Sequence, residues 1–245
     1  MPVHQIHTPD DHTAVLFFSH RPEREWQNKQ FVRRDLKKHR AVAETLYRHS
    51  LRAARSSGYP VLEMTDARQR GTGFGARFAN AVADAFAQGY ERVIAVGSDC
   101  PRLHEVSWDD VAAHLSDDTP VLGPTPGRDG TYLIGLTRDQ FDREAFEALP
   151  WTTSALFPAL RRYLRRRAGT APACLAARDD VNGHTDLMAL MRRRAALPAE
   201  LRDRLRRVLG MGIEGGVFRT ARPRRPGRSH RSRAPPLGPC PRRCG

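Results

Sequence analysis

Two aspartates stand beside glycine or proline at the ends of short apolar runs. Asp99 follows the run Val93–Val96 within the segment GSDCP, and Asp129 stands in the loop after the run Pro120–Gly123. A short apolar run bounded by charged residues and glycine predicts a buried strand. Ligands bind at the carboxyl edge of open α/β sheets, so a carboxylate directly after such a strand is a candidate site residue.

The hydrophobic pattern predicts the elements that must position these acids. Further apolar runs predict strands at Ala14–Phe18, Pro60–Met64, Thr131–Leu136 and Ala173–Ala176. Apolar residues at helical spacing predict a helix from Leu36 to Ser57, which Gly58 ends. A strand, a helix and a strand with short links form a βαβ unit, so we expect an α/β fold with an at least partly parallel sheet.

Helical patterns continue through the rest of the chain. They predict a helix across Phe74–Phe86, one that starts after Ser107, and others at Ser154–Arg167, Asp186–Arg194 and Pro198–Leu209. As an N-cap, Ser107 would place Asp109 and Asp110 in the first helical turn, where acids favour the helix dipole, so we interpret both acids as structural. Thr185 is the expected N-cap of the helix at Asp186–Arg194.

The composition predicts one folded domain with charged appendages. The 245 residues are 40% hydrophobic, which suffices for a sizeable core. The formal net charge is +14, and segment 210–245 holds nine arginines and one glutamate, which is +8 of that total. We expect a flexible N-terminus over 1–12, a domain over 13–209 and a disordered Arg/Pro/Gly-rich tail over 210–245. Net charge reports poorly on function, so no specific nucleic-acid partner is expected.

The sequence predicts neither a membrane span nor an oxidising compartment. No apolar run is long enough to cross a bilayer, and the first twelve residues lack the apolar core of a signal peptide. The four cysteines have no regular spacing that would indicate a disulfide framework, and Cys240 with Cys244 makes a poor metal site. The expected location is therefore the cytoplasm.

Five segments carry a family resemblance because they occur in the expected order. They are QRGTGFGAR at 69–77, VIAVGSDCP at 93–101, VLGP at 121–124, DGTYLIGL at 129–136 and LPWTT at 149–153. The chain resembles, over roughly residues 13–190, a bacterial glycosyltransferase-like family of the radical-SAM/selenodomain-associated transferase type 1, or arsenosugar-biosynthesis glycosyltransferase, kind. The resemblance implies the A-type nucleotide-sugar transferase fold: a Rossmann-like, mostly parallel mixed sheet sandwiched by helices.

The resemblance also implies a binding site for a nucleotide sugar. Its candidate residues are Lys29, Gln69, Gly73, Arg77, Ser98, Gly130 and Trp151. The glycine-rich loop that holds Gly73 precedes a helix, whose N-terminus can bind phosphate, although its spacing matches neither the dinucleotide nor the P-loop pattern. Lys29 could supply positive charge to a phosphate, or belong to a solvated basic helix face. Trp151 is a candidate for the sugar or acceptor side, with a core position as the alternative.

Catalysis in such an enzyme would use a divalent cation and a base. Asp99 fits the metal-binding acid of the family for Mg²⁺ or Mn²⁺, and Asp129, Asp180 or His184 could supply a second ligand, of which we select Asp180. Asp129 is the candidate catalytic residue, a general base that takes the proton of an acceptor hydroxyl. The alternative for Asp129 is an ordinary turn residue.

Three functions are compatible with these motifs. The first is a glycosyltransferase that moves a sugar from a nucleotide diphosphate to a small-molecule acceptor, with homodimerisation left open. The second is a nucleotidyltransferase of the cofactor-guanylyltransferase type, although these have a glycine-rich loop after the first strand, where this chain has SHRPER. The third is a non-catalytic relative, an alternative supported by two features: only Pro22 and Lys29 match the donor loop, and Thr131 replaces a glycine. Of the three, we predict the glycosyltransferase.

Overall fold

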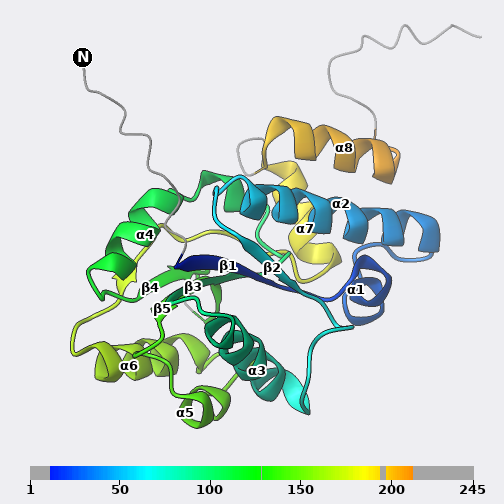
Figure 1. The fold of residues 1–245 in the computed structure, drawn as a ribbon. Coiled ribbons are helices and arrows are strands. Elements are labelled where there is room, and N and C mark those ends of the chain that lie inside the picture. Colours follow the sequence, from blue (N-terminus) through cyan, green and yellow to red (C-terminus); the bar gives the residue numbers. More distant parts are fainter. Residues whose placement is uncertain (1–11, 128, 194–196, 212–245) are drawn as a thin grey trace, which may run out of the picture. The chain divides into compact units, whose positions relative to one another are not determined.

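One six-stranded sheet forms the centre of the part of the chain that the structure, a computed structural model, describes: residues 12–127, 129–193 and 197–211. The strand order is β2-β1-β3-β5-β4-β6 (Figure 1). The strands are β1 (Thr13–Phe18), β2 (Val61–Met64), β3 (Arg92–Val96), β4 (Val121–Pro124), β5 (Thr131–Thr137) and β6 (Ala173–Cys174).

The sheet is mixed, and only β5 runs against its neighbours. Strand β1 pairs in parallel with β2 and β3, and β4 pairs in parallel with β6. Strand β5 is antiparallel to both β3 and β4. The connection between β4 and β5 carries Asp129, so this acid lies near the carboxyl end of β4. The predicted fold class, a mostly parallel mixed sheet between helices, is confirmed.

Helices cover both faces of the sheet. Figure 1 shows α3, α5 and α6 on one face and α2, α4, α7 and α8 on the other. Alternate residues of β1 serve the two faces: Leu16 packs with α3 and α6, whereas Val15 and Phe17 pack with α2 and α4. The helices are α1 (Pro22–Asn28), α2 (Leu36–Arg55), α3 (Gly73–Ala87), α4 (Trp108–Ser116), α5 (Arg143–Glu147), α6 (Leu156–Ala168), α7 (His184–Arg192) and α8 (Ala199–Leu209).

The predicted elements are all present, with differences at helix starts and in short helices. Ser107 caps α4 as expected and accepts a hydrogen bond from the backbone N–H of Asp110. Thr185 was the wrong cap for α7, because the helix starts at His184 and Gly183 takes the N-cap position. Helices α1 and α5, and the 3-10 helix η1 (Leu103–Glu105), were not predicted because they are too short to show a helical period.

The predicted domain boundaries are not tested by this structure. The described residues extend from 12 to 211 with two internal gaps, so they cover the predicted domain at 13–209. Nearly all of the predicted N-terminal segment 1–12 and tail 210–245 lies outside them. Among the described residues, no helix is both long and apolar enough to cross a membrane.

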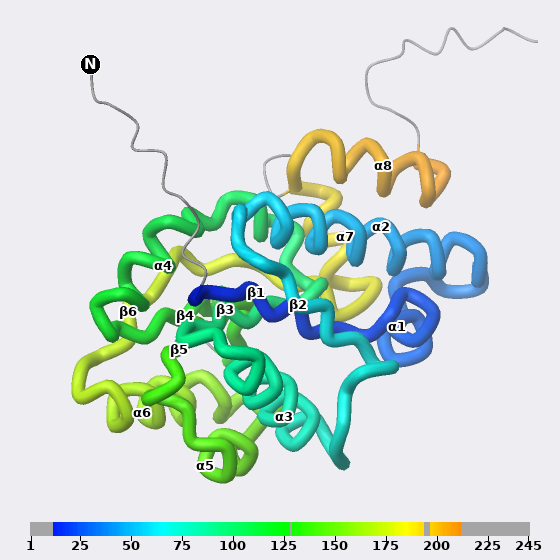
Figure 2. Tube along the Cα trace, in the orientation of Figure 1, coloured from blue at the N-terminus to red at the C-terminus, as the bar shows by residue number. Residues whose placement is uncertain are grey.

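The order in which the chain adds strands to the sheet changes side at β1. Figure 2 traces it from β1 through α1 and α2 to β2, and then through α3 to β3 on the other side of β1. Connections that leave β1 and β3 in opposite directions open a crevice at their carboxyl ends. Ser19, Ser98 and Asp99 directly follow these two strands, so the topology places them at this crevice.

We predict that a side chain at Gly75, at the start of α3, destabilises the protein. A Cβ atom there would lie 2.5 Å from the backbone oxygen of Glu147 and 2.7 Å from Cδ1 of Trp151. Glycine to alanine normally stabilises a helix, so a loss here would come from this clash. Gly75→Ala should lower the free energy of unfolding by about 1–3 kcal/mol, measured by urea denaturation.

Gly97→Ala is the matched control for this prediction. Its added Cβ would meet the backbone oxygen of Phe18 at 3.7 Å, an ordinary contact, so its unfolding midpoint should stay near that of the wild type. Equal midpoints for the two variants would contradict the close approach of α3 to the Trp151 segment.

Candidate functional site

Buried serines join the two strands at the base of the crevice. Ser19 follows β1 and Ser98 follows β3, and the hydroxyl of Ser19 donates to Oγ of Ser98 at 2.7 Å. Ser50 of α2 donates its own hydroxyl to the backbone oxygen of Ser98 at 3.0 Å. Since all three side chains are buried, these bonds fix the backbone that presents Asp99.

Lys29 lies between two carboxylates at the mouth of the crevice. Its Nζ is 2.9 Å from Oε1 of Glu25, one turn earlier in α1, and forms an ion pair with Asp99 from the other side. Burial by itself would lower the pKa of Lys29, but the negative charges of Asp99 and Glu25 outweigh burial and raise it. Lys29 is therefore a fixed positive charge that compensates two acids.

Asp180 approaches the same place from the segment between β6 and α7. The backbone N–H of Val181 donates to the backbone oxygen of Asp99 at 2.9 Å, which links the two segments. Burial raises the pKa of Asp180, and the negative charge of Asp99 acts in the same direction. Asn182 opposes this shift by donating to Oδ2 of Asp180 at 2.7 Å. The two acids thus feel each other's charge across the crevice.

Arg178 holds the Asp180 segment in place. Its side chain is only 11% exposed and forms an ion pair with Glu105 of η1. Its Nη2 also donates to the backbone oxygen of Glu105 at 2.9 Å, and its backbone N–H donates to the oxygen of Pro124 at 3.1 Å. The segment that carries Asp180 is therefore fastened to the turn after Asp99 and to the end of β4.

Two residues beside Asp99 have structural rather than chemical roles. Burial raises the pKa of the Cys100 thiol to about 12, so it stays protonated at neutral pH and is a poor metal ligand. His49 of α2 donates from Nε2 to the backbone oxygen of Pro101 at 2.8 Å. Burial lowers the pKa of His49, so the neutral ring holds the turn that follows Asp99.

Two cavities meet at Asp99. A polar cavity of about 390 Å³ and an apolar cavity of about 290 Å³ share Phe18, Phe74 and Asp99 as lining residues. The other residues of the polar cavity are Ser19, His20, Glu25, Asn28, Lys29, Gln69, Arg77 and Ser98. The apolar cavity is lined by aromatic and aliphatic residues together with Gly97, Gly130, Thr131, Thr152 and Asp180. The site thus has a polar and an apolar half with one carboxylate between them.

Three polar atoms of residues that line the polar cavity are buried without a partner. They are Nδ1 of His20, Oε1 of Gln69 and Nε of Arg77. The amide orientation of Gln69 is fixed, because its Nε2 donates to the backbone oxygens of Ser19 at 3.1 Å and Met64 at 3.0 Å. Buried polar groups are costly when unpaired, so three of them around one cavity indicate a place for a polar ligand.

The structure brings most of the predicted site residues together. Lys29, Gln69, Arg77, Ser98 and Asp99 line the polar cavity, and Asp99, Gly130, Trp151 and Asp180 line the apolar one. Trp151 also belongs to the core cluster, as its alternative interpretation predicts, and its place on the sugar or acceptor side stays a prediction.

Two predicted residues line neither of these cavities. Asp129 accepts a hydrogen bond from the hydroxyl of Thr125 at 2.9 Å within the β4–β5 turn, and Gly73 begins α3 with a φ of +81°. Asp129 nevertheless directly precedes Gly130, which lines the apolar cavity.

Sequence reasoning missed Glu25 and His20. Glu25 is the buried acid that orients Lys29, and His20 contributes an unpartnered nitrogen to the polar cavity. A usable signal existed for Glu25: Pro22 is a favoured first helical residue, and Glu25 with Lys29 forms an i, i+4 pair. No comparable local signal marks His20.

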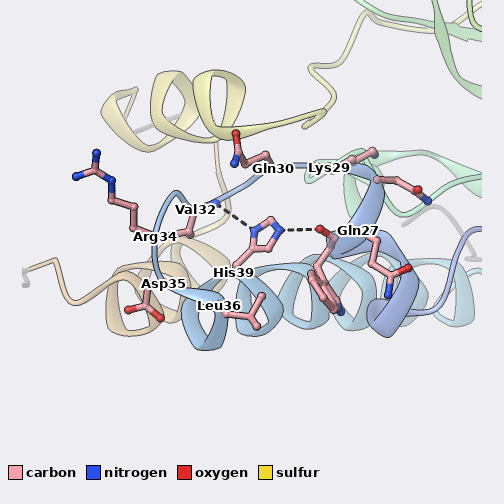
Figure 3. Close-up of a pocket in the computed structure, with 10 residues that line it drawn as sticks. Gln27, Lys29, Gln30, Val32, Arg34, Asp35, Leu36 and His39 are labelled. Carbon is pink, nitrogen blue, oxygen red and sulfur yellow. Dashed lines mark hydrogen bonds between the residues drawn. The ribbon is translucent and has the colours of Figure 1, made fainter.

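A third cavity of about 640 Å³ lies beside the polar one and shares Asn28 and Lys29 with it. Figure 3 shows His39 at its centre. Its Nε2 donates to the backbone oxygen of Trp26 at 2.8 Å, and its Nδ1 accepts from the N–H groups of Phe31 and Val32. Both ring nitrogens are used, so His39 serves to hold the loop that follows Lys29.

Comparisons with known proteins agree with this fold. Residues 24–153, more than half of the chain, match a family described as an uncharacterized protein conserved in bacteria, DUF2064. No curated protein matches the chain.

A crystal structure of a candidate nucleotide-diphospho-sugar transferase from Desulfovibrio desulfuricans G20 is similar at 22% identity and a TM-score of 0.59. The match covers 84% of this chain and all of the other. This identity supports a shared fold alone. A CMP:2-keto-3-deoxy-manno-octonic acid synthetase in complex with CTP matches at 13% identity over 74% of this chain and 99% of the other. Its TM-score of 0.33 is too low to support a shared fold.

We predict that the Lys29 ion pairs are strongly coupled. Lys29→Met leaves Glu25 buried without a counter-charge and should lower the free energy of unfolding by about 3–5 kcal/mol. The double variant Glu25→Gln/Lys29→Met removes both charges of this pair and should recover most of that loss. A double-mutant cycle in urea measures the coupling, and additive effects would contradict a shared buried pair.

We predict a pH-dependent loss of stability from His49. Its pKa is lowered on folding, so the folded state binds fewer protons and stability falls as the pH drops below the ordinary value of 6.5. His104, Arg52 and Glu200 act on the same ring. His49→Gln keeps a donor for Pro101 and should lose less stability than the wild type between pH 7 and 5. Parallel pH profiles in thermal denaturation would refute this assignment.

Proposed function

The chain belongs to the bacterial family DUF2064, and from that premise we propose that it transfers a sugar from a nucleotide diphosphate to the hydroxyl of a small acceptor. The finer assignment to the arsenosugar-biosynthesis kind stays part of this proposal. The observation that carries it is the pair of cavities that meet at Asp99. The donor would occupy the polar cavity, and the acceptor would approach from the apolar one.

The unpartnered atoms of the polar cavity support nucleotide binding there. Oε1 of Gln69 needs a donor, Nε of Arg77 needs an acceptor, and Nδ1 of His20 can serve as either. A nucleotide offers both kinds of group on its base, ribose and phosphates. Ligand binding would satisfy these atoms and recover the free energy that their burial costs.

The charges of the polar cavity support a divalent cation. Two negative side chains, Glu25 and Asp99, balance two positive ones, Lys29 and Arg77. A diphosphate brings about two further negative charges, which Mg²⁺ or Mn²⁺ would neutralise. Lys29 cannot do so alone, because Glu25 and Asp99 already use its charge.

The residues present fit such a cation if the substrate supplies part of its ligand shell. Among the described residues, no group of three or more His, Cys, Asp or Glu side chains could hold a metal ion. Asp99 lines both cavities and Asp180 lines the apolar one, so the two carboxylates would hold the cation where the cavities meet. Mg²⁺ commonly takes one or two carboxylates plus substrate phosphates. When bound, the cation would stabilise the charge that develops on the departing diphosphate.

The remaining steps are proposed for residues of this chain. Lys29 and Arg77 would orient the phosphates, and Ser98 would keep Asp99 in place through its hydroxyl, 3.3 Å from Oδ1. Asp129 is the proposed base, because Thr125 holds its Oδ1 and leaves Oδ2 to take the acceptor proton.

Thermal-shift measurements with UDP-, GDP-, ADP- and dTDP-sugars and nucleoside triphosphates test this proposal. One nucleotide sugar should stabilise the protein only when Mn²⁺ is present, by about 2.7 kcal/mol at 100 times its Kd. Asp99→Asn should remove the stabilisation that the nucleotide sugar gives in the presence of Mn²⁺. Glu200→Gln, an exposed change on α8 outside the two cavities that meet at Asp99, is the control and should leave the shift intact.

Other outcomes would replace the proposal. Stabilisation by a triphosphate alone, with release of pyrophosphate, would indicate a nucleotidyltransferase. No stabilisation by any nucleotide would favour a non-catalytic relative in which Lys29 permanently occupies the place beside Asp99.

A further inference from the structure

The apolar cavity has an aromatic wall. Phe18, Phe74, Phe78 and Trp151 line one part of it, and Ile134 and Leu156 another. All six side chains belong to or pack against the core cluster between the sheet and helices α3, α5 and α6. The cavity is therefore an opening into the hydrophobic core.

The aromatic wall is rigid. Nε1 of Trp151 donates to the backbone oxygen of Phe146 at 2.9 Å, and its ring lies within 5.5 Å of those of Phe74, Phe78 and Phe146. The adjacent Thr152 has a φ of +61°, which is rare for a β-branched residue and is retained mainly at functional positions. The cavity is thus formed before any ligand enters it.

The charged groups of this cavity are confined to one end. Among its described lining residues, only Asp99 and Asp180 carry charge. Asp99 also lines the polar cavity, so a hydroxyl that hydrogen-bonds to these carboxylates would lie beside the proposed donor. Beyond these acids, the lining offers the side-chain hydroxyls of Thr131, Tyr132 and Thr152. A compound with many hydroxyls would leave part of them unpaired, which costs free energy for each group.

The volume limits the size of the ligand. A cavity of about 150 Å³ lined by apolar side chains can hold benzene. The 290 Å³ of this cavity therefore suit a body of one or two fused rings, or an aliphatic group of similar size. Larger acceptors would have to extend past Thr152 into solvent.

We propose that the acceptor is a small, largely apolar alcohol or phenol. Its body occupies the cavity between Phe74, Trp151 and Leu156. Its single hydroxyl points to Asp99 and Asp180 and lies beside Gly130. Asp129, which directly precedes Gly130, takes its proton. This inference adds a substrate class to the proposed function and rests on it, because the compound is an acceptor only if the protein transfers a sugar. The preference for an apolar hydroxyl compound rests on the cavity alone.

Isothermal titration without nucleotide tests the cavity directly. The probes are 2-naphthol, 2-methoxynaphthalene, which cannot donate a hydrogen bond, and myo-inositol, which is polar. We expect 2-naphthol to bind about tenfold more tightly than its methyl ether, because a hydrogen bond to a carboxylate is lost in the ether. Binding of myo-inositol should be undetectable.

Variants at Gly97 show where the probe binds. The Cβ of Gly97→Ala would make only an ordinary contact at 3.7 Å, so this variant should fold while it narrows the cavity. Gly97→Val adds two further methyl groups, and its fold is compared with that of the wild type by circular dichroism before binding is measured. Binding of 2-naphthol should weaken stepwise, by at least about tenfold for Gly97→Val. Ala113→Val, on the exposed face of α4, is the matched control and should bind like the wild type.

The outcomes separate this inference from the proposed function. Binding of myo-inositol without 2-naphthol would overturn the apolar acceptor, while nucleotide-sugar stabilisation would leave the transferase standing. Equal binding of 2-naphthol by Gly97→Val and wild type would place the probe elsewhere and overturn it too. Selective 2-naphthol binding, with its glycoside detected by mass spectrometry when nucleotide sugar and Mn²⁺ are added, would support both. Selective binding with no response to any nucleotide would overturn the role as acceptor.

Discussion

The site depends on one buried positive charge, the ammonium of Lys29. Glu25 and Asp99 approach it from two elements that are far apart in sequence, and each forms an ion pair with it. The ion pairs attach α1 to the carboxyl end of β3, and the hydrogen bond from Val181 to Asp99 attaches the segment before α7. One cation therefore organises three segments around the crevice, and it is also the group on which a diphosphate would act.

The topology explains why these segments meet. Strand β1 lies between β2 and β3, and the connections that leave β1 and β3 at the carboxyl edge run in opposite directions. The connection between β4 and β5 brings Gly130 to the same edge. The ion pair of Arg178 with Glu105 holds the segment that carries Asp180 beside it. The sheet thus supplies a rigid frame, while the loops after its strands supply the polar groups.

The polar and the apolar cavity meet at the carboxyl edge of the sheet. Phe18 and Phe74 lie at the boundary, where the core opens and the polar groups begin. A reaction that joins a charged donor to an apolar hydroxyl compound needs such a boundary, because each substrate is held by a different physical effect. Asp99 lies where the two cavities meet, and its pairing with Lys29 would keep it oriented before either proposed substrate binds.

The sequence by itself determined the strands, the long helices and the position of Asp99, because local hydrophobic periodicity and the strand-then-acid pattern depend only on neighbours in the chain. It could not reveal α1, whose seven residues are too few for a period, nor the burial of Glu25 that follows from that helix. Only the tertiary structure decided that Lys29 binds Asp99, that Arg178 fastens Asp180, and that Asp129 stands in a turn outside the cavity lining. These are contacts between distant segments, and their energies depend on burial and charge in the folded chain.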